Sequence, residues 1–433
     1  MPRRNLHLLI LIVVVSLACR FRADRYGQTL TFAMGQIDRR YLEEVDRAEL
    51  FQGAMQGMVD CLADDYSAFI TPSAVNEFQQ SLDQKFCGVG MEVSLDPETR
   101  QLTVMSPLVG TPAYEAGIRA GDRILKIDGQ STQGPSLKDA VGRMQGEPGE
   151  PVVLSVLHPG EEEPVDIEIV RAVIRVDTVA GDTRNADGSW NYFLEGHPDI
   201  GYLRINAFGE RTADEMRRAM GQLDSEGLKG LILDLRNDPG GLLTAAIEVC
   251  DLFIDSGVIV STRRRDGRIR DRYEATGAAA FGDFPMAVLV NQYSASASEI
   301  VAACLQDHGR AIVVGQRSWG KGTVQEIIEL GPGQGILKLT TASYWRPSGK
   351  NIHRTSDADE DDDWGVIPDE GYQVIVEGED LTELLRRRMQ RDVFKPAEEG
   401  DTENAAPREP LEDPQLDKAI EYVRRAIDEA EEP

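Results

Sequence analysis

The chain has 433 residues, a length typical of about three domains at roughly 150 residues each. Hydrophobic residues make up 41% of it and charged residues 28%, which is ordinary for globular protein with more than one core. The formal net charge is −28, from 46 basic and 74 acidic residues. This balance argues against nucleic acid as a partner, because phosphate binding needs a concentrated basic face, and against docking on anionic lipid through charge.

Cysteine and histidine are sparse and scattered. The five cysteines include no C-x-x-C pair, which disfavours both a zinc cluster and a disulfide scaffold. The five histidines show no H-E-x-x-H spacing, which disfavours a metal hydrolase. We therefore expect no metal site.

The first residues carry the clearest signal about the compartment. Two arginines precede an apolar run over residues 8–18, which is too short to span a bilayer comfortably. Small residues end the run, and Cys19 follows at once. The pattern predicts that residues 1–19 are a signal peptide, or an anchor that holds the protein at the membrane through lipid on Cys19. We expect an exported protein, either periplasmic or attached to the cell envelope.

Residues 22–84 have a helical pattern. Leu30, Met34, Ile37 and Tyr41 recur at the spacing of one apolar helix stripe, and Thr71-Pro72 predicts the start of a further helix. Such an arm is expected to pack on its own chain, or else to pair with a second copy in a homodimer or higher oligomer.

Residues 85–172 have the pattern of short strands and turns that is typical of a small β-rich domain. Short strands are expected over 89–93 and 102–104, a strand ends in the Asp-Gly turn at 128–129, and a helix is expected over 136–144. The segment has the right size for one compact domain.

Strands and helices alternate from residue 173 to residue 378. Strands are expected over 200–208, 231–235, 285–290 and 311–315, and helices over 212–226, 242–254 and 295–307. Thr212-Ala213-Asp214-Glu215 predicts a capping box at the start of the first helix. Repeated units of this kind indicate a layered α/β core.

Residues 379–433 are expected to hold a basic helix from 381, an acidic proline-containing linker and an amphipathic last helix over 416–430. An acidic run over 357–363 precedes this region. It lacks the glycine of an EF-hand loop, so a solvated loop is favoured over a calcium-responsive one.

A run of small residues, Ser294-Ala295-Ser296-Ala297-Ser298-Glu299, joins an expected strand to an expected helix. A hydroxyl at this turn sits at the positive end of the helix, where a developing anion is stabilised. Ser296 and Glu299 also have the spacing of a capping box. The residues alone therefore leave two alternatives, a nucleophile and a helix cap.

A serine nucleophile needs a base, and no histidine lies in a convincing setting. Lys321 is flanked by Gly320 and Gly322, which let the backbone approach a neighbour closely, and burial in a dry site lowers the pKa of a lysine. Gln325 follows four residues later and is a candidate for orienting the amine. The turn Asn237-Asp238-Pro239-Gly240-Gly241 offers backbone N–H groups for an oxyanion hole.

Several segments, in a fixed order, resemble the carboxyl-terminal processing proteases, also called tail-specific proteases. They are Gly88-Val89-Gly90 with Thr111-Pro112-Ala113, Leu233-Asp234-Leu235-Arg236-Asn237-Asp238-Pro239-Gly240-Gly241, Ser294-Ala295-Ser296-Ala297-Ser298-Glu299-Ile300 and Gly320-Lys321-Gly322-Thr323-Val324-Gln325. The resemblance covers about residues 41–376. It implies a multidomain α/β fold with a crotonase/ClpP-like layered protease core, an inserted PDZ domain and an N-terminal helical arm.

The resemblance also implies a role for each matching residue. Ser296 would be the nucleophile and Lys321 the general base, with Gln325 holding the lysine. The oxyanion donors would be backbone N–H groups of Gly240 or Gly241 and of Ala297. The PDZ loop that binds the substrate's C-terminus would be Gly88, Val89 and Gly90.

The expected activity is that of a serine endopeptidase on exported proteins with exposed or unfolded C-terminal tails. The partners are then protein or peptide substrates with free C-termini, and a Ser–Lys site needs no cofactor. The alternative is a catalytically silent adaptor on the same fold, which binds tails without cutting them. The joint presence of Ser296, Lys321 and Gln325 favours the enzyme.

Overall fold

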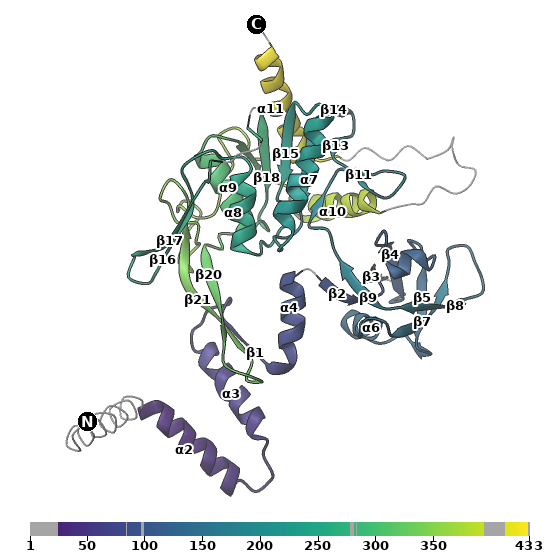
Figure 1. Cartoon of the computed structure of the whole chain (residues 1–433), viewed down its shortest axis with the longest axis vertical. Coiled ribbons are helices and arrows are strands. Elements are labelled where there is room, and N and C mark those ends of the chain that lie inside the picture. The colour runs from purple at the N-terminus through teal and green to yellow at the C-terminus, as the bar shows by residue number, and fades with distance from the viewer. Residues whose placement is uncertain are drawn as a thin grey trace, which may run out of the picture. The chain divides into compact units, whose positions relative to one another are not determined.

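The computed structural model describes residues 25–83, 85–96, 99–277, 281–282, 284–393 and 412–431 (Figure 1). The chain divides into two compact units. The first comprises residues 1–75 and 325–340, and the second comprises residues 76–324 and 341–433. The expected signal or anchor segment over residues 1–19 lies outside the described residues. None of the helices that are described is long and apolar enough to cross a membrane.

The first unit is built on two helices and three strands. They are α2 (Arg25–Arg40), α3 (Arg47–Asp60), β1 (Ala68–Ile70), the 3₁₀ turn η1 (Pro72–Ala74) and the parts of β20 and β21 that fall within residues 325–340. Asp46 caps α3 by accepting the Ala48 N–H at 2.7 Å. The strand β1 was not expected from the sequence, because its pairing partner, Ile336–Lys338, lies far along the chain.

The apolar stripe of α2 stays largely exposed among the described residues. No residue of α2 is buried among the described residues, and Leu30 and Ile37 are each 42% exposed. The packing of the arm on its own chain is met for α3, where Val59 is buried and Phe51 contacts Phe69 of β1, whereas α2 buries no residue among those described.

The second unit begins with α4 (Val75–Asp83) and a β-rich domain. Its elements are β2 (Lys85–Gly88), β3 (Met91–Leu95), β4 (Leu102–Pro107), α5 (Pro112–Glu115), β5 (Arg123–Ile127), β6 (Gln130–Ser131), α6 (Leu137–Met144), β7 (Pro151–Leu157), β8 (Val165–Val170) and β9 (Ala172–Arg175). The main sheet has the order β3-β4-β5-β7-β8, and β2 pairs with β9. The strand expected over 89–93 is broken at Gly90, whose φ of 85° ends the extended backbone.

A mostly parallel sheet forms the centre of the second unit. Its order is β10-β14-β15-β18-β19, and β13 pairs with β14. The strands are β10 (Val179–Ala180), β13 (Phe193–Leu194), β14 (His197–Ile205), β15 (Gly230–Asp234), β18 (Met286–Val290) and β19 (Ile312–Gly315). The alternation of strands and helices predicted for this region is confirmed.

Helices cover both faces of this sheet, so its strands are apolar on both sides. On one face, Leu231, Leu233 and Val288 pack against α7 (Thr212–Ser225), α8 (Leu243–Asp251) and α9 (Ala297–Asp307). On the other face, Ile232 and Leu289 pack against α11 (Pro414–Glu431). A Cβ on Gly230 would lie 2.3 Å from Val423 Cγ1, so α11 lies directly over β15.

Buried ion pairs attach α10 (Gly378–Asp392) to the same unit. Arg388 contacts the Asp182 carboxylate at 3.0 Å and Arg391 contacts it at 2.9 Å. The remaining strands are β11 (Thr183–Arg184), β12 (Trp190–Asn191), β16 (Val258–Arg263), β17 (Ile269–Glu274), β20 (Thr323–Glu329) and β21 (Ile336–Trp345). Within the second unit, β16 pairs with β17 and with Ser343–Trp345.

The capping box predicted at Thr212 is wrong. The helix α7 does begin at Thr212, but its N-cap is Arg211, which makes no side-chain cap bond. The Glu215 carboxylate instead accepts the Thr178 N–H at 2.7 Å and the Thr178 hydroxyl at 2.8 Å. A tertiary contact with the segment at β10 has therefore taken the place of the local bond.

Candidate active site

Ser296 lies at the turn between β18 and α9, where its backbone has a φ of 58°. Non-glycine residues rarely adopt this left-handed region, and such strain concentrates at functional turns. Ser296 forms the capping box with Glu299 and is nearly buried, with 7% of its surface exposed. The structure therefore combines the cap with an exceptional backbone conformation, and the cap does not exclude a nucleophile.

The neighbouring serines fix this turn to the glycine turn after β15. The Ser294 hydroxyl donates to the Leu235 carbonyl at 2.8 Å, and the Ser298 hydroxyl donates to the Asp238 carbonyl at 3.0 Å. The Ala295 N–H donates to the same Asp238 carbonyl at 3.0 Å. Ser294 and Ser298 thus have structural bonds on either side of Ser296.

The Glu299 carboxylate connects the turn at Ser296 with the segment at Lys321. Its Oε2 accepts the N–H of Ser296 and the N–H of Lys321, both at 2.8 Å. Its Oε1 accepts the Gly320 N–H at 2.6 Å and the Ser318 hydroxyl at 2.5 Å. Glu299 is fully buried, and burial raises its pKa to about 7 despite these four donors.

Close backbone packing explains the two glycines beside Lys321. A Cβ on Gly320 would lie 2.7 Å from Arg354 Cβ, and a Cβ on Gly322 would lie 2.2 Å from His353 N. The Trp319 N–H also donates to the Ser294 carbonyl at 3.0 Å. The close approach predicted for these glycines is confirmed, and its neighbours are Arg354 and His353. The half-buried Lys321 is joined to the turn at Ser296 through the Trp319 and Glu299 hydrogen bonds.

The glycine turn lies directly against the turn at Ser296. A Cβ on Gly240, whose φ is 92°, would lie 2.8 Å from Ala297 N and 2.8 Å from Ser296 Cβ. Gly240 is therefore brought against Ser296 and Ala297, while Gly241, which follows it, lies against the Phe208 backbone. However, the Gly240 N–H already donates to Asp238 Oδ1 at 2.8 Å. This argues against Gly240 as an oxyanion donor and leaves Gly241 and Ala297 as the predicted pair.

Asp238 is a buried residue that the sequence reasoning did not assign. Its side chain is fully buried, and Oδ2 has no hydrogen-bond partner in the part of the chain that is described. Burial raises its pKa to about 8. Carboxyl groups with raised pKa values cluster at functional sites, but a single sequence gives no signal for this one.

An arginine supports the glycine turn from behind. Arg236 donates to Asp234 Oδ2 at 2.6 Å, and it binds Asp413 through two bonds of 2.9 Å and 2.8 Å. All three charged groups are buried. Asp413 precedes α11, so the C-terminal region reaches the base of the turn.

The acidic run over 357–363 is attached to the same part of the molecule. Its acidic side chains are exposed, as expected for a solvated loop. Arg317 stacks on Trp364, with its guanidinium carbon 3.6 Å from the ring centroid, and donates to the Glu360 carbonyl at 2.6 Å. We call these Arg317 contacts with Trp364 and Glu360 the Arg317 clamp; Arg317 lies four residues before Lys321.

The predicted PDZ loop is tightly packed. The Val89 carbonyl accepts the Ala113 N–H at 2.8 Å, and the Gly90 carbonyl accepts the Thr111 hydroxyl at 2.7 Å. A Cβ on Gly90 would lie 2.4 Å from Thr111 Cβ. Gly88 ends β2, so Gly88, Val89 and Gly90 form the connection to β3. Among the described strands β3 pairs only with β4, which leaves it at an edge of its sheet.

Gln325 lies on β20 in the first unit, where its side-chain amide donates to Thr340 Oγ1 at 3.2 Å. Ser296 and Lys321 belong to the second unit. The role of Gln325 beside Lys321 therefore stays a prediction.

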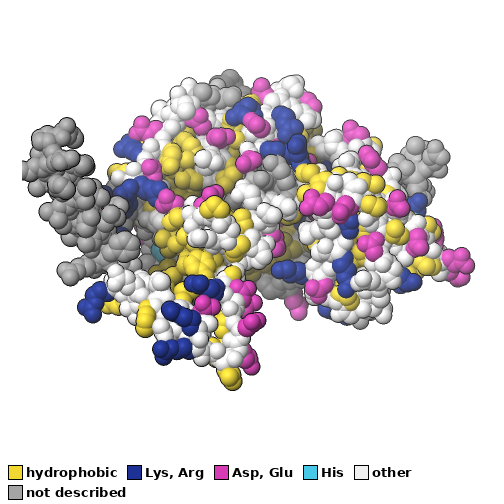
Figure 2. Space-filling model, turned by 60° about the horizontal axis from the view of Figure 1, so that its bottom comes forward, with side chains coloured by type: hydrophobic (Ala, Val, Ile, Leu, Met, Phe, Trp, Pro, Cys, Tyr) yellow, Lys and Arg dark blue, Asp and Glu magenta, His cyan; other side chains and the backbone are white. Residues whose placement is uncertain are grey.

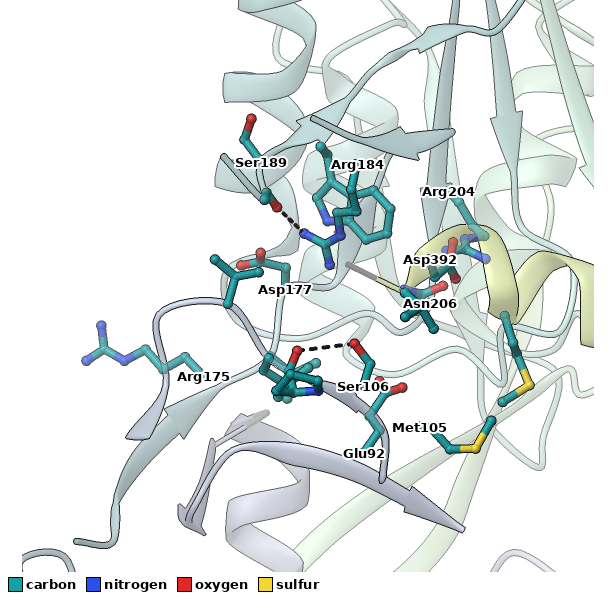
Figure 3. A pocket seen from close by; sticks show the side chains of 18 of the residues that line it. Glu92, Met105, Ser106, Arg175, Asp177, Arg184, Ser189, Arg204, Asn206 and Asp392 are labelled. Carbon is teal, nitrogen blue, oxygen red and sulfur yellow. Dashed lines mark hydrogen bonds and ion pairs between the residues drawn. The ribbon is translucent and has the colours of Figure 1, made fainter. Parts of the chain in front are cut away.

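A cavity of about 490 Å³ lies elsewhere in the second unit (Figure 3). It is lined by Glu92 and Met105 from the β-rich domain and by Arg184, Arg204 and Asp392. Neither Ser296 nor Lys321 is among its lining residues. This cavity is separate from the candidate active site.

A parallel sheet that presents a buried serine, a glycine turn and a lysine at one edge defines the class of α/β serine peptidases, here with an inserted peptide-binding domain. Comparison with known proteins supports each part. Residues 199–371 match peptidase family S41, residues 103–157 match a PDZ domain, and residues 28–73 match the N-terminal domain of the activating protease CtpB.

Two curated relatives extend the match over most of this chain, and a solved structure resembles it as well. The carboxy-terminal-processing protease of Bartonella bacilliformis is 36% identical over 98% of this chain and 94% of its own length. The carboxyl-terminal-processing protease of Synechocystis is 38% identical over 73% of this chain and 70% of its own. A photosystem II D1 C-terminal processing protease structure is 30% identical, covers 79% of this chain and 86% of its own, and has a TM-score of 0.46.

The chain belongs to the carboxyl-terminal processing protease family. It is a serine-type peptidase with a PDZ domain that recognises peptide substrates, and the catalytically silent adaptor is not favoured. Figure 2 shows Lys and Arg side chains interleaved with Asp and Glu on the described part of one face, which fits a protein substrate better than a nucleic acid.

Proposed function

We propose that Ser296 is the nucleophile of this protease and Lys321 its general base. The observation that carries the proposal is the shared Glu299 carboxylate, which accepts the backbone N–H groups of both residues at 2.8 Å. The two segments are thus held together, with Ser296 buried and Lys321 half-buried, and Lys321 carries the side-chain amine nearest in sequence to this turn, the group that a base requires.

The chemistry follows from these roles. Neutral Lys321 takes the proton of the Ser296 hydroxyl, and the serine oxygen bonds to the carbon of a substrate peptide carbonyl. The backbone N–H groups of Gly241 and Ala297 stabilise the resulting oxyanion. The lysine ammonium then protonates the leaving amine as the C–N bond breaks. Water hydrolyses the acyl-enzyme in a second round of the same proton transfers. In this scheme Gln325 orients the lysine.

The direct test is cleavage of an unfolded protein with an apolar C-terminal tail. The unaltered chain should cleave it with or without chelator, whereas Ser296→Ala and Lys321→Ala should each lose at least about 10³-fold in rate. Ser298→Ala is the matched control, because it removes one of the bonds that hold the turn and no reacting group, so its loss should be far smaller than that of Ser296→Ala. Full cleavage by Ser296→Ala would refute the assignment.

The substrate is proposed to be an exported protein with an exposed C-terminal tail. The tail would add as a strand to the edge of β3, while backbone N–H groups of the loop Gly88-Val89-Gly90 take its terminal carboxylate. A tail peptide with a free carboxylate should bind at least about tenfold more tightly than the same peptide with a C-terminal amide. Equal affinities would contradict carboxylate capture.

Location at the cell envelope is also a proposal, supported by the signal-like segment over residues 1–19. The mature protein should appear in the exported or membrane fraction, and mass spectrometry of its N-terminus will show either cleavage or lipid on Cys19. Release from the membrane by Cys19→Ser would support the lipid anchor. A cytoplasmic protein with an intact N-terminus would contradict export.

Pairing with a second copy is the proposed role of the uncovered stripe on α2. Ile37→Asp should lower the molar mass measured by light scattering, whereas Gln28→Glu, off the stripe, should not. An unchanged mass for Ile37→Asp would rule out pairing through this stripe.

A further inference from the structure

Glu299 has more hydrogen bonds than a helix cap needs. A capping box requires only that the carboxylate accept the N–H of the capping residue, here Ser296. Glu299 also accepts the N–H of Lys321, the N–H of Gly320 and the Ser318 hydroxyl. Three of its four donors therefore come from the Lys321 segment, more than 18 residues further along the chain.

The arrangement at Oε2 is specific to the two proposed reacting residues. One oxygen atom accepts both the Ser296 N–H and the Lys321 N–H at equal distances of 2.8 Å. Two N–H groups that converge on one oxygen fix the separation of their own backbones. The side chains of Ser296 and Lys321 start from these backbones, so the position of Oε2 sets the distance over which the proton must move.

Close packing restricts the Glu299 carboxylate to this position. Glu299 is fully buried, and a Cβ on Gly365 would lie 2.9 Å from Ser318 Oγ and 3.6 Å from Glu299 Oε1. Ser318 Oγ in turn accepts the Val366 N–H at 2.7 Å. The carboxylate is thus held from the turn, from the Lys321 segment and from the segment after the acidic run.

We propose that Glu299 is the positioning residue that sets the distance between the backbones of the nucleophile Ser296 and the base Lys321. It does not touch the reacting atoms. It acts through the two backbones that it joins, and the inference rests on the proposed roles of these residues. Misplacement of a catalytic group by about 1 Å can cost about 10²-fold in rate, so the effect should appear in kcat.

The test compares two carboxylates in the full-length protein. Glu299→Gln keeps the shape but offers one accepting oxygen instead of two, and Glu299→Ala offers none. Glu215 is the matched control, because it is also a buried glutamate in the first turn of a core helix and also accepts backbone N–H groups. It is bonded to the segment at β10 and has no contact with the Ser296 turn among its described hydrogen bonds.

We expect kcat to fall about tenfold in Glu299→Gln and about 10²-fold in Glu299→Ala, with KM within about threefold of the unaltered value. Glu215→Gln and Glu215→Ala should lose activity only in proportion to their unfolded fraction. Tryptophan fluorescence measures this fraction for the protease core, because all four tryptophans lie between residues 190 and 364.

Three outcomes would overturn the inference: an unchanged kcat, a loss confined to KM, or a kcat loss no greater than that of the Glu215 variants at equal folded fraction. The Ser296→Ala variant separates this result from the proposed function. If it is inactive while the Glu299 variants are fully active, only the positioning role fails. If it is active, the assignment of the nucleophile fails.

Discussion

The buried Asp238 predicts an unusual dependence of core stability on pH. Its Oδ1 accepts the Gly240 N–H at 2.8 Å, and its Oδ2 has no hydrogen-bond partner in the described structure. Burial raises its pKa from an ordinary 3.8 to about 8, so the folded protein keeps this proton at neutral pH. Asp238→Asn preserves the shape and the accepting oxygen but cannot ionise.

The magnitude follows from the proton balance. Between about pH 4 and pH 8 the folded state holds a proton that the unfolded chain has released. A rise in pH therefore favours unfolding by about 1.4 kcal/mol per pH unit. This stabilising contribution is complete below the unfolded pKa and is lost as the pH rises through the folded one. From pH 5 to pH 7 the unfolding free energy of Asp238→Asn should gain about 2.7 kcal/mol relative to Asp238.

The assay is guanidinium denaturation at pH 5, 6 and 7, with both proteins carrying Ser296→Ala to prevent self-digestion. Tryptophan fluorescence isolates the core, because the PDZ domain contains no tryptophan. Glu299, whose pKa burial also raises, is present in both proteins and cancels in the difference. A difference that stays constant from pH 5 to pH 7 would refute the reasoning, because it would mean that Asp238 is ionised in the folded state.

Three further changes test other parts of the structure. Gly240→Ala places a Cβ 2.8 Å from Ala297 N at a φ of 92°, so proteolysis should fall by at least about 10²-fold, and an unchanged rate would contradict the close packing. Ile427→Ala should lower the unfolding free energy by about 2–4 kcal/mol in the fluorescence assay, whereas a surface change such as Arg425→Ala should cost under about 0.5 kcal/mol. Arg317→Lys removes the stacking on Trp364 and most of the hydrogen bonds to backbone carbonyls near the acidic run. Added trypsin should therefore cut the variant near residues 357–363 faster than it cuts the unaltered protein. Equal rates of cutting in the two proteins would argue against a role for the Arg317 clamp.

Much of the central sheet could be predicted because its signals are local. The strand expected over 231–235 is β15, Gly230–Asp234, and the helix expected over 295–307 is α9, Ala297–Asp307. The glycines also predicted local structure correctly. Gly240 marks a turn, because its φ is one that other residues rarely adopt. The glycines beside Lys321 mark a close approach, because a Cβ at either position would overlap a neighbour.

What the sequence could not indicate depends on partners that are distant along the chain. The short strand β1 forms against Ile336–Lys338, and the last helix covers β15, although neither pairing has a local pattern. The spacing of Ser296 and Glu299 predicted a cap, but not the bonds to Lys321 and Gly320. Glu215 illustrates the converse, because a correct local pattern lost its cap to a tertiary contact.

The position of α11 has a consequence for how the core is completed during synthesis. The helix covers the second face of the central sheet, and the adjoining Asp413 binds Arg236 below the glycine turn. During synthesis the chain exposes Ile232 and Leu289 until residues 413–431 have been made and have docked. Ser296 and Lys321 are made more than 90 residues before Asp413, so the layer beneath the glycine turn is still missing when both side chains already exist. The apolar face of the central sheet therefore stays open to wrong partners throughout that interval.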